Sequence, residues 1–276
     1  MFGNRGRSGR DERLGQGFED ERNFGRQQNS RFDDYNNQGG QGHIAMGSRD
    51  SELESRSALY LAKVMGWMCV GLLTTVVAAL ATLTVEPLFM LVFGGSPFVI
   101  FIVQIGLVLV LSRGIGRLSP GAATVLFMLY SGVTGLTMSV FVLIYDLGSL
   151  LLAFSVTTFV FLTMSVYGFV TRKDLTSIGR LCLFGLIGII LAMVVNIFLA
   201  NTMMDFVITV IGVLVFIGLI AYDTQHIKGL HQHALASGYD EYSPELRKLA
   251  IIGALKLYLD FINLFIMMLR LLGRRR

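Results

Sequence analysis

The sequence predicts an all-α, polytopic integral membrane protein, and three observations carry this prediction. Hydrophobic residues make up 53% of the 276 positions and charged residues only 15%, against roughly 25% charged residues in ordinary soluble domains. Apolar runs of about 20 residues recur along the chain, and each can cross a hydrocarbon core about 30 Å thick. A backbone in lipid must satisfy its own hydrogen bonds, so each run is expected to form a helix.

The first 57 residues differ in composition from the rest. They are rich in Gly, Arg, Asn, Gln and Asp, and their nine Arg residues nearly balance ten acidic residues. Such a segment buries too little apolar surface to offset its ordering entropy, so residues 1–57 are predicted to be a disordered polar tail. Its Arg-Gly steps and scattered aromatic residues are similar to nucleic-acid-binding tails. The interleaved acids cancel the positive field that phosphate binding requires, so no nucleic-acid partner is expected.

Seven spans are predicted within residues 58–273, which suits one helical bundle rather than several domains. The second span is short, because Pro87 and the Gly-Gly-Ser-Pro sequence at 94–97 interrupt the chain before it. Residues 88–93 are a candidate partial insertion beside that span. The predicted spans cover residues 64–85, 98–112, 121–145, 147–170, 181–200, 206–222 and 251–272.

Basic residues predict how the bundle is oriented. Alternate connections carry Lys or Arg, whereas those around Glu86, Asp146 and Asp205 carry none. Basic residues are enriched on the cytoplasmic side of membrane proteins, so the amino terminus and the basic connections are expected in the cytoplasm. Arg270 and residues 274–276 disagree with this pattern, because they would lie outside if the last span crosses fully. Either these late charges are overruled by the earlier spans, or the last segment enters the membrane and returns.

Small residues recur at four-residue spacing on two spans. Such faces let membrane helices approach each other closely. We therefore expect both to be packing surfaces rather than the lining of a pore. The two sets are Ser131, Gly135 and Ser139 on the third span, and Gly188, Ala192 and Asn196 on the fifth.

The last two spans each carry one acid. Asp223 ends the sixth span, and Asp260 lies about 15 Å along the seventh at 1.5 Å per residue. A carboxylate within a hydrophobic span is costly and is seldom placed there without a use. Two carboxyl groups in contact would share a proton and titrate as a coupled pair, and when deprotonated they would suit Ca²⁺. A competing interpretation is that Lys256 and Asp260, spaced i,i+4, form a local ion pair that only neutralises the helix.

Four stretches of the chain carry a resemblance to a known family. They are VFIGLIAYDTQHI at 215–227, ALKLYLDFINLF at 254–265 with Leu269 and Arg270 after it, LFMLYSGVTGLT at 126–137, and TRKDLT at 171–176. Together and in this chain's order they resemble the Bax inhibitor-1 family, most closely its bacterial branch. The likeness runs from about residue 58 to residue 273 and leaves only the tail uncovered.

The resemblance implies seven helices with the last near the centre, and a pH-sensitive leak of cations such as Ca²⁺ gated by paired aspartates. Asp223 and Asp260 match that pair as proton sensor, ion gate and candidate Ca²⁺ ligands. Arg113, which ends the second span, matches a basic residue that holds the first aspartate. Arg270 matches a basic residue late in the last span that pairs with an acid on the second span. Here the second span offers only Gln104, whose neutral amide makes a weaker tie than a carboxylate.

The leading interpretation is therefore a pH-sensitive Ca²⁺ leak channel or transporter of the bacterial plasma (inner) membrane, with the lipid bilayer and cations as its partners and no cofactor. The alternative is a non-conducting regulator that binds a membrane protease or another membrane complex. In that case both aspartates could be neutralised without loss of function.

Other chemistry is sparse in the sequence. His226, His231 and His233 lie near or within the polar connection before the last span, and they are expected to be solvated rather than to bind metal. The sequence contains no P-loop, G-x-S-x-G or H-E-x-x-H motif, so no enzymatic activity is expected.

Overall fold

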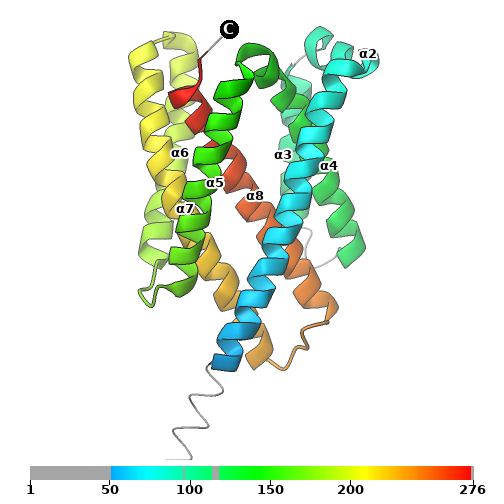
Figure 1. Ribbon diagram of the computed structural model, residues 1–276, viewed down its shortest axis with the longest axis vertical. Helices are drawn as coiled ribbons and strands as arrows, with labels where there is room; N and C mark the ends of the chain where they lie inside the picture. The colour runs from blue at the N-terminus through cyan, green and yellow to red at the C-terminus, as the bar shows by residue number, and fades with distance from the viewer. Residues whose placement is uncertain (1–50, 96, 114–117, 275–276) are drawn as a thin grey trace, which may run out of the picture. The chain divides into compact units, whose positions relative to one another are not determined.

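The computed structural model describes residues 51–95, 97–113 and 118–274, and every regular element within them is helical. Most of the predicted tail, residues 1–50, lies outside the described residues. The elements are the Ser51–Thr84 helix, α2 (Glu86–Phe89), the π-helical turn η1 (Met90–Gly94), α3 (Pro97–Arg113), α4 (Pro120–Ile144), α5 (Leu147–Val170), α6 (Thr176–Leu199), α7 (Thr202–Ala236) and α8 (Pro244–Leu272) (Figure 1).

Polar residues define where four of these helices begin. In each case the side chain before the first turn accepts a hydrogen bond from a backbone N–H of that turn, which has no partner within the helix. Pro120 and Pro244 follow two of these caps at the first helical position, where a missing N–H costs nothing. The four capping residues are Ser119, Asp146, Asn201 and Ser243.

The seven predicted spans are the upper number that the described helices allow. Six of the described helices are long and apolar enough to cross a membrane. Residues Glu86–Gly94 and Val99–Leu111 form a pair bent by 98°, which makes a seventh span if the pair crosses as one. The bend follows the Gly- and Pro-rich break that shortens the second predicted span. The all-α polytopic fold is therefore confirmed.

Two predicted boundaries differ from the structure, one at the start of the Ser51–Thr84 helix and one at the end of α7. The first helix includes residues 51–57, which composition alone assigns to the tail. Its first turns are rich in helix-favouring residues, and Arg56 and Glu52 form an i,i+4 ion pair at 2.7 Å. The polar segment after residue 222 also stays helical as far as Ala236. Ile227, His231 and Ala234, one turn apart, are buried on its inner face, so packing sustains this helix beyond its apolar run.

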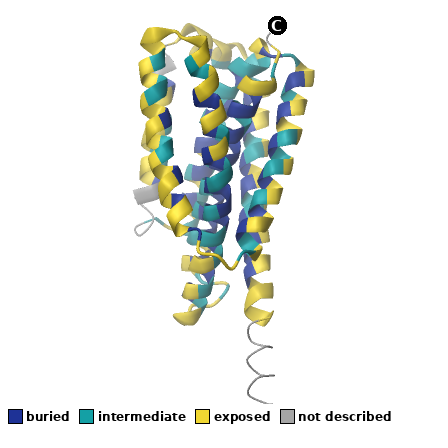
Figure 2. Cartoon of the chain, turned by 90° about the vertical axis from the view of Figure 1, so that its left-hand side faces the viewer, coloured by how far each residue is buried: buried dark blue, intermediate teal, exposed yellow. Residues whose placement is uncertain are grey.

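The last helix, α8, forms the centre of the bundle. In its most apolar stretch 61% of α8 is buried, against 11% of α6. It packs against α4, α5 and α7, and Figure 2 shows the buried residues gathered inside the bundle with exposed residues on the outer helix faces. The backbone N–H of Arg274 donates to the hydroxyl of Ser149 at the start of α5. The last helix therefore runs the full length of the bundle and does not turn back.

The two small-residue faces have different environments. A Cβ on Gly135 would lie 2.5 Å from the Cβ of Ala78 and from the carbonyl oxygen of Thr75. Here α4 and the Ser51–Thr84 helix approach as closely as expected. Gly188 on α6 is exposed, and a Cβ on it would meet no neighbouring atom within 4 Å. The prediction of a packing surface within the chain is therefore confirmed at Gly135 and wrong at Gly188.

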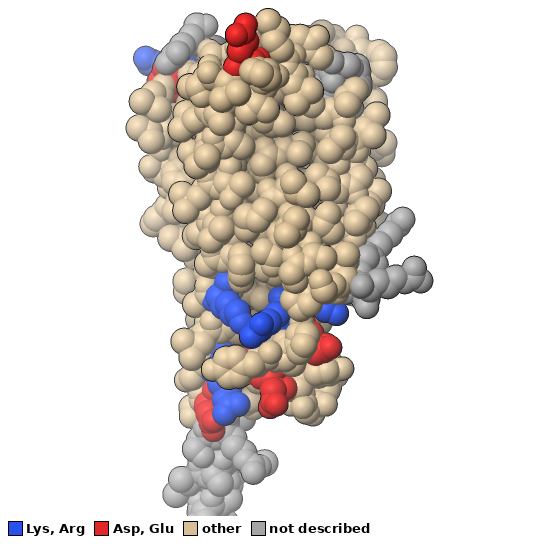
Figure 3. All heavy atoms as spheres, turned by 90° about the vertical axis from the view of Figure 1, so that its right-hand side faces the viewer, with Lys and Arg blue, Asp and Glu red and all other residues tan. Residues whose placement is uncertain are grey.

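The surface carries the pattern of a membrane-embedded bundle. Figure 3 shows a broad belt without charged side chains on one face, bordered at its lower edge by a group of basic side chains. Exposed apolar residues such as Phe184 (73%) and Phe198 (84%) cover the outer face of α6. In water such a surface would be an aggregation hazard, whereas in lipid it is the expected exterior.

Candidate functional site

Asp223 is held inside the bundle by the inner face of α7. Its neighbours on that face, Leu219, Ile220 and Ile227, are buried, and Asp223 itself is only 9% exposed. The residue lies about 30 Å along α7 from Thr202, at 1.5 Å per residue, which is close to one thickness of the hydrocarbon core. Asp223 thus lies near one border of the apolar belt.

Asp260 faces Asp223 from the central helix. It is 6% exposed, and Leu257, Phe261 and Leu264 around it are buried. The two carboxyl groups interact electrostatically. A hydrogen bond between them would require a proton on one of them, since two carboxylates can only accept. The structure therefore brings together the two acids that the sequence singled out.

Lys256 completes the charged cluster. Its Nζ lies 3.5 Å from Oδ1 of Asp223, on the neighbouring helix. The interpretation of Lys256 and Asp260 as a local i,i+4 ion pair is wrong, because among these three described residues the only ion pair joins Lys256 to Asp223. The Lys256 side chain is 41% exposed and that of Asp223 is 12% exposed. One partly solvated ammonium group is therefore the ion-pair partner of Asp223 and also interacts electrostatically with Asp260.

The buried interior of α5, α7 and α8 has unused hydrogen-bonding capacity. Within the described residues, four buried side-chain oxygens on α5, α7 and α8 have no hydrogen-bond partner, and one of them is Oδ2 of Asp260. Buried polar atoms are normally paired, often with an ordered water or an ion. The three helices pack against one another. The other oxygens belong to Thr157, Ser165 and Thr224.

Close packing fixes the position of α7 beside the cluster. A Cβ on Gly168 of α5 would overlap the backbone of Ala221, two residues before Asp223. Only glycine allows the two helices to approach this closely. The connection after α5 is also held, since the side chain of Gln225 accepts from the backbone N–H of Leu175 and donates to the carbonyl of Lys173.

The described part of the structure does not show the predicted partner of either stabilising arginine. Arg113 is the last residue of α3, but its side chain lies outside the described part of the structure. Arg270 does not pair with Gln104. Its guanidinium group lies 3.3 Å from Oδ1 of Asp205, at the start of α7, and the amide of Gln104 donates to hydroxyl groups of α4. In place of the weaker tie to Gln104, Arg270 forms an ion pair between the end of α8 and the start of α7.

The expectation that the histidines are solvated is wrong for one of them. His231 is fully buried, stacks on Tyr60 at 4.3 Å between ring centroids, and lies 3.3 Å from the hydroxyl of Ser57 through Nδ1. The phenol of Tyr60 donates to the carbonyl of Leu246. These contacts join the Ser51–Thr84 helix to the end of α7 and the start of α8. Within the described ranges, no group of three or more His, Cys, Asp or Glu side chains could hold a metal ion.

Known proteins are similar to this chain over nearly all of its helical part. The family model described as "Inhibitor of apoptosis-promoting Bax1" matches residues 57–276. This range contains Asp223, Lys256 and Asp260, together with both residues of the Asp205–Arg270 pair.

Three bacterial relatives are similar to the chain over most of its length. The inner membrane protein YbhL of Escherichia coli strain K12 is 44% identical over 231 residues, covering 82% of this chain and 97% of the relative. Protein RP147 of Rickettsia prowazekii is 41% identical over 230 residues, covering 83% and 95%. A protein of Borreliella burgdorferi is 41% identical over 220 residues, covering 79% and 92%.

Proposed function

The chain belongs to the Bax inhibitor-1 family of membrane proteins, and from that premise we propose that it is a pH-sensitive Ca²⁺ leak channel or transporter gated by Asp223 and Asp260. The observation that carries the proposal is the buried pair of carboxyl groups with a single ammonium group, Lys256, beside it. The proposed location is the inner membrane of a bacterium, with the amino terminus and the basic connections in the cytoplasm.

Charge balance explains how this cluster would respond to protons and cations. With both carboxyl groups ionised, Lys256 leaves one negative charge uncompensated in a largely buried site. Such a charge is costly away from water. Either a proton or a cation can neutralise it, so the two compete for the same site. This competition would couple the flux of the cation to pH.

The surrounding groups fit a transient cation better than a permanent one. Ca²⁺ takes six to eight oxygen ligands, and two carboxylates supply at most four oxygens. Water and the unpaired hydroxyl groups of the interior, such as that of Thr224, would have to supply the rest. A site of this kind binds weakly, and weak binding is what a conducting path requires. Ca²⁺ is therefore the proposed cargo rather than a resident metal.

Arg113 and Lys256 have complementary roles in this proposal. Lys256 neutralises Asp223 in the structure at 3.5 Å. Arg113, at the end of α3, is the proposed additional cation that holds Asp223 in the closed state. Replacing Lys256 should therefore alter the pH response without abolishing the carboxyl pair.

Flux measurements in proteoliposomes test the proposal. Calcium uptake is followed between about pH 6 and pH 8, a range in which coupled carboxyl groups can titrate, for the native chain and for Asp223→Asn and Asp260→Asn. We expect a pH-dependent flux in the native chain and a flat profile in both variants. Asp174→Asn is the matched control, because Asp174 is an exposed aspartate of the α5–α6 connection, and it should behave like the native chain.

Two outcomes would contradict the proposal. The absence of flux above empty vesicles at every pH, from protein shown to be folded, would exclude a leak. A native pH profile in both aspartate variants would exclude the carboxyl pair as the gate. The first outcome would favour the non-conducting regulator of a membrane protease, for which the search would turn to a bound partner.

A further inference from the structure

An apolar groove opens between the Ser51–Thr84 helix, the second half of α4 and the start of α5. It has a volume of about 410 Å³ and reaches α8. Figure 1 shows α8 behind the Ser51–Thr84 helix and α5, which stand apart in front of it. All side chains that line the groove are apolar except Thr75. The hydroxyl of Thr75 is already engaged with that of Tyr258 at 2.6 Å and with the carbonyl of Ser131.

The rim of the groove belongs to the lipid-facing surface and its floor to the core. Val76 on the first helix is 52% exposed, and Leu147 and Leu151 on α5 are 63% and 58% exposed. Phe261 and Ile262 of α8, on the floor, are only 3% and 9% exposed. The groove is thus a continuation of the bilayer-facing surface into the centre of the bundle.

We propose that this groove binds one acyl chain of a membrane phospholipid. An apolar cavity does not hold water, and an empty one forfeits the dispersion contacts of its lining. The mouth opens on the hydrocarbon layer, where acyl chains are the surrounding solvent. Leu147 is the first residue of α5, so the groove lies toward the end of the bundle remote from Asp223, and a chain of the nearer leaflet enters it.

The surroundings favour an acyl chain as the occupant, because the lining is apolar except for Thr75 and the rim is continuous with the lipid-facing surface. The absence of charge along the lining also makes the groove unsuitable for an ion.

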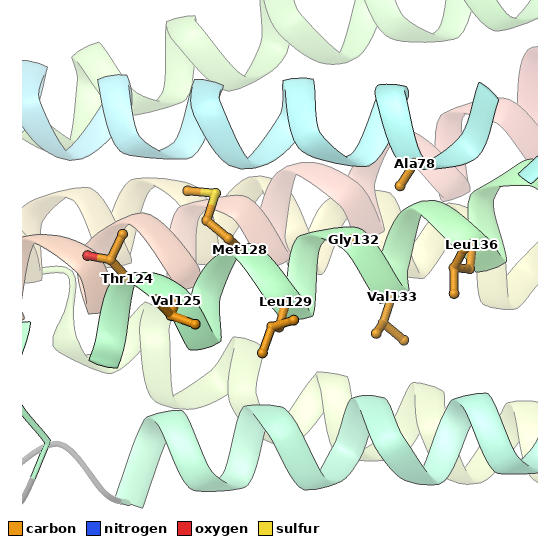
Figure 4. A pocket seen from close by; sticks show the side chains of 8 residues that line it. All are labelled: Ala78, Thr124, Val125, Met128, Leu129, Gly132, Val133 and Leu136. Carbon is orange, nitrogen blue, oxygen red and sulfur yellow. The ribbon is translucent and has the colours of Figure 1, made fainter. Parts of the chain in front are cut away.

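A second apolar hollow on the surface provides a contrast. It has a volume of about 460 Å³, and seven of its eight lining residues lie along α4, with Ala78 contributed by the first helix (Figure 4). No residue of α8 lines it. It is a depression along one helix, whereas the groove beside α5 leads to the segment of α8 that carries Asp260.

Lipid in the groove would contact the residues that directly follow Asp260 on α8. An acyl chain against Phe261 and Ile262 fills the space into which this part of α8 could otherwise move. The binding site itself follows from shape and polarity, and it stands whether or not the chain conducts ions.

Quenching by brominated phospholipids tests the site directly, because bromine quenches only nearby indole rings. Trp67 is the single tryptophan and is replaced by Phe to give a silent background. Phe261→Trp then reports on the groove floor. Phe216→Trp on α7 is the matched control, since Phe216 is also 3% exposed but does not line the groove. Phe184→Trp, at 73% exposure, reports full contact with lipid.

In vesicles of brominated phosphatidylcholine we expect Phe261→Trp to be quenched nearly as strongly as Phe184→Trp, and Phe216→Trp much less. If Phe261→Trp does not fold, Phe265→Trp on the same wall serves as the reporter. Adding Val76→Phe, which narrows the mouth, should reduce the quenching at the floor.

Three results would overturn the proposal. One is quenching at Phe261→Trp no greater than at Phe216→Trp. Another is quenching at the floor that Val76→Phe leaves unchanged, because the lipid would then arrive by a different path. The third is quenching that falls as the protein-to-lipid ratio rises, which would indicate that a second copy of the chain fills the groove.

Discussion

Helices α7 and α8 are joined by two acid–base pairs, and the two pairs have very different surroundings. Lys256 and Asp223 lie 3.5 Å apart, and Arg270 and Asp205 lie 3.3 Å apart. The Asp223 side chain is 12% exposed, whereas that of Asp205 is 42% exposed. Geometry alone would rank the two pairs as equivalent.

The difference lies in what surrounds each pair. The Asp205 carboxylate is paired with Arg270 and is also solvated, so both the ion pair and water stabilise its charge. Asp223 shares its lysine with Asp260, which is buried and has an oxygen without a partner. An exposed ion pair contributes little to stability, and its charges are already compensated. The buried cluster carries an uncompensated negative charge whenever both carboxyl groups are ionised, and for this reason we propose the gate at Asp223 and Asp260 rather than at Asp205.

The largest effect on stability is expected from removing the shared lysine. Lys256→Met leaves two buried carboxyl groups without a cation and should destabilise the protein by roughly 2–4 kcal/mol, somewhat less than for a fully buried pair because Lys256 is partly solvated. The apparent melting temperature in detergent measures this. Adding Asp223→Asn should restore most of the loss, and a double variant no more stable than Lys256→Met would refute the shared-cation interpretation.

A smaller effect is expected from separating α5 and α7 beside the cluster. Gly168→Ala places a methyl group against the backbone of Ala221, which should cost about 1–3 kcal/mol by overpacking and shift Asp223. Gly229→Ala on α7 is the control, since a Cβ there meets no atom within 4 Å. Alanine in an exposed helical position should be neutral or slightly stabilising. Equal melting temperatures for the two variants would contradict the tight contact.

The smallest effect is expected at the exposed pair. Asp205→Asn removes the ion pair with Arg270 and should cost less than about 1 kcal/mol, with the difference from the native chain shrinking as salt is added. The pH profile of calcium flux should not change. A loss of stability comparable to that of Lys256→Met would show that the Arg270–Asp205 pair matters as much as the Lys256–Asp223 pair. The contrast between the two pairs would then be wrong.

Hydropathy is sufficient to place most of the helices but not all of their ends. The predicted span 147–170 coincides with α5, because this helix begins and ends at the borders of its apolar run. The predicted span 206–222 stops well before the end of α7 at Ala236. Hydropathy reports which residues lie in lipid, whereas the polar part of α7 is held by burial of His231 against Tyr60, a contact between residues far apart in the chain.

The residues of the site can likewise be named from the sequence, but not their partners. Asp223 and Asp260 are conspicuous as acids within apolar spans, and Lys256 as the nearest base. Spacing along one helix places Lys256 beside Asp260, yet its ammonium group reaches across to Asp223. The same applies to Arg270, whose partner is Asp205 rather than a residue of the second span.

The sequence by itself determined the membrane class of this protein, its helical content and the identity of its buried acids. These properties follow from local composition, because lipid imposes hydrogen bonding within each segment and penalises charge wherever it occurs. Only the tertiary structure decided that one lysine serves two acids and that an apolar groove leads to α8. Both depend on how tilted helices meet, which is set by packing between side chains from distant parts of the chain.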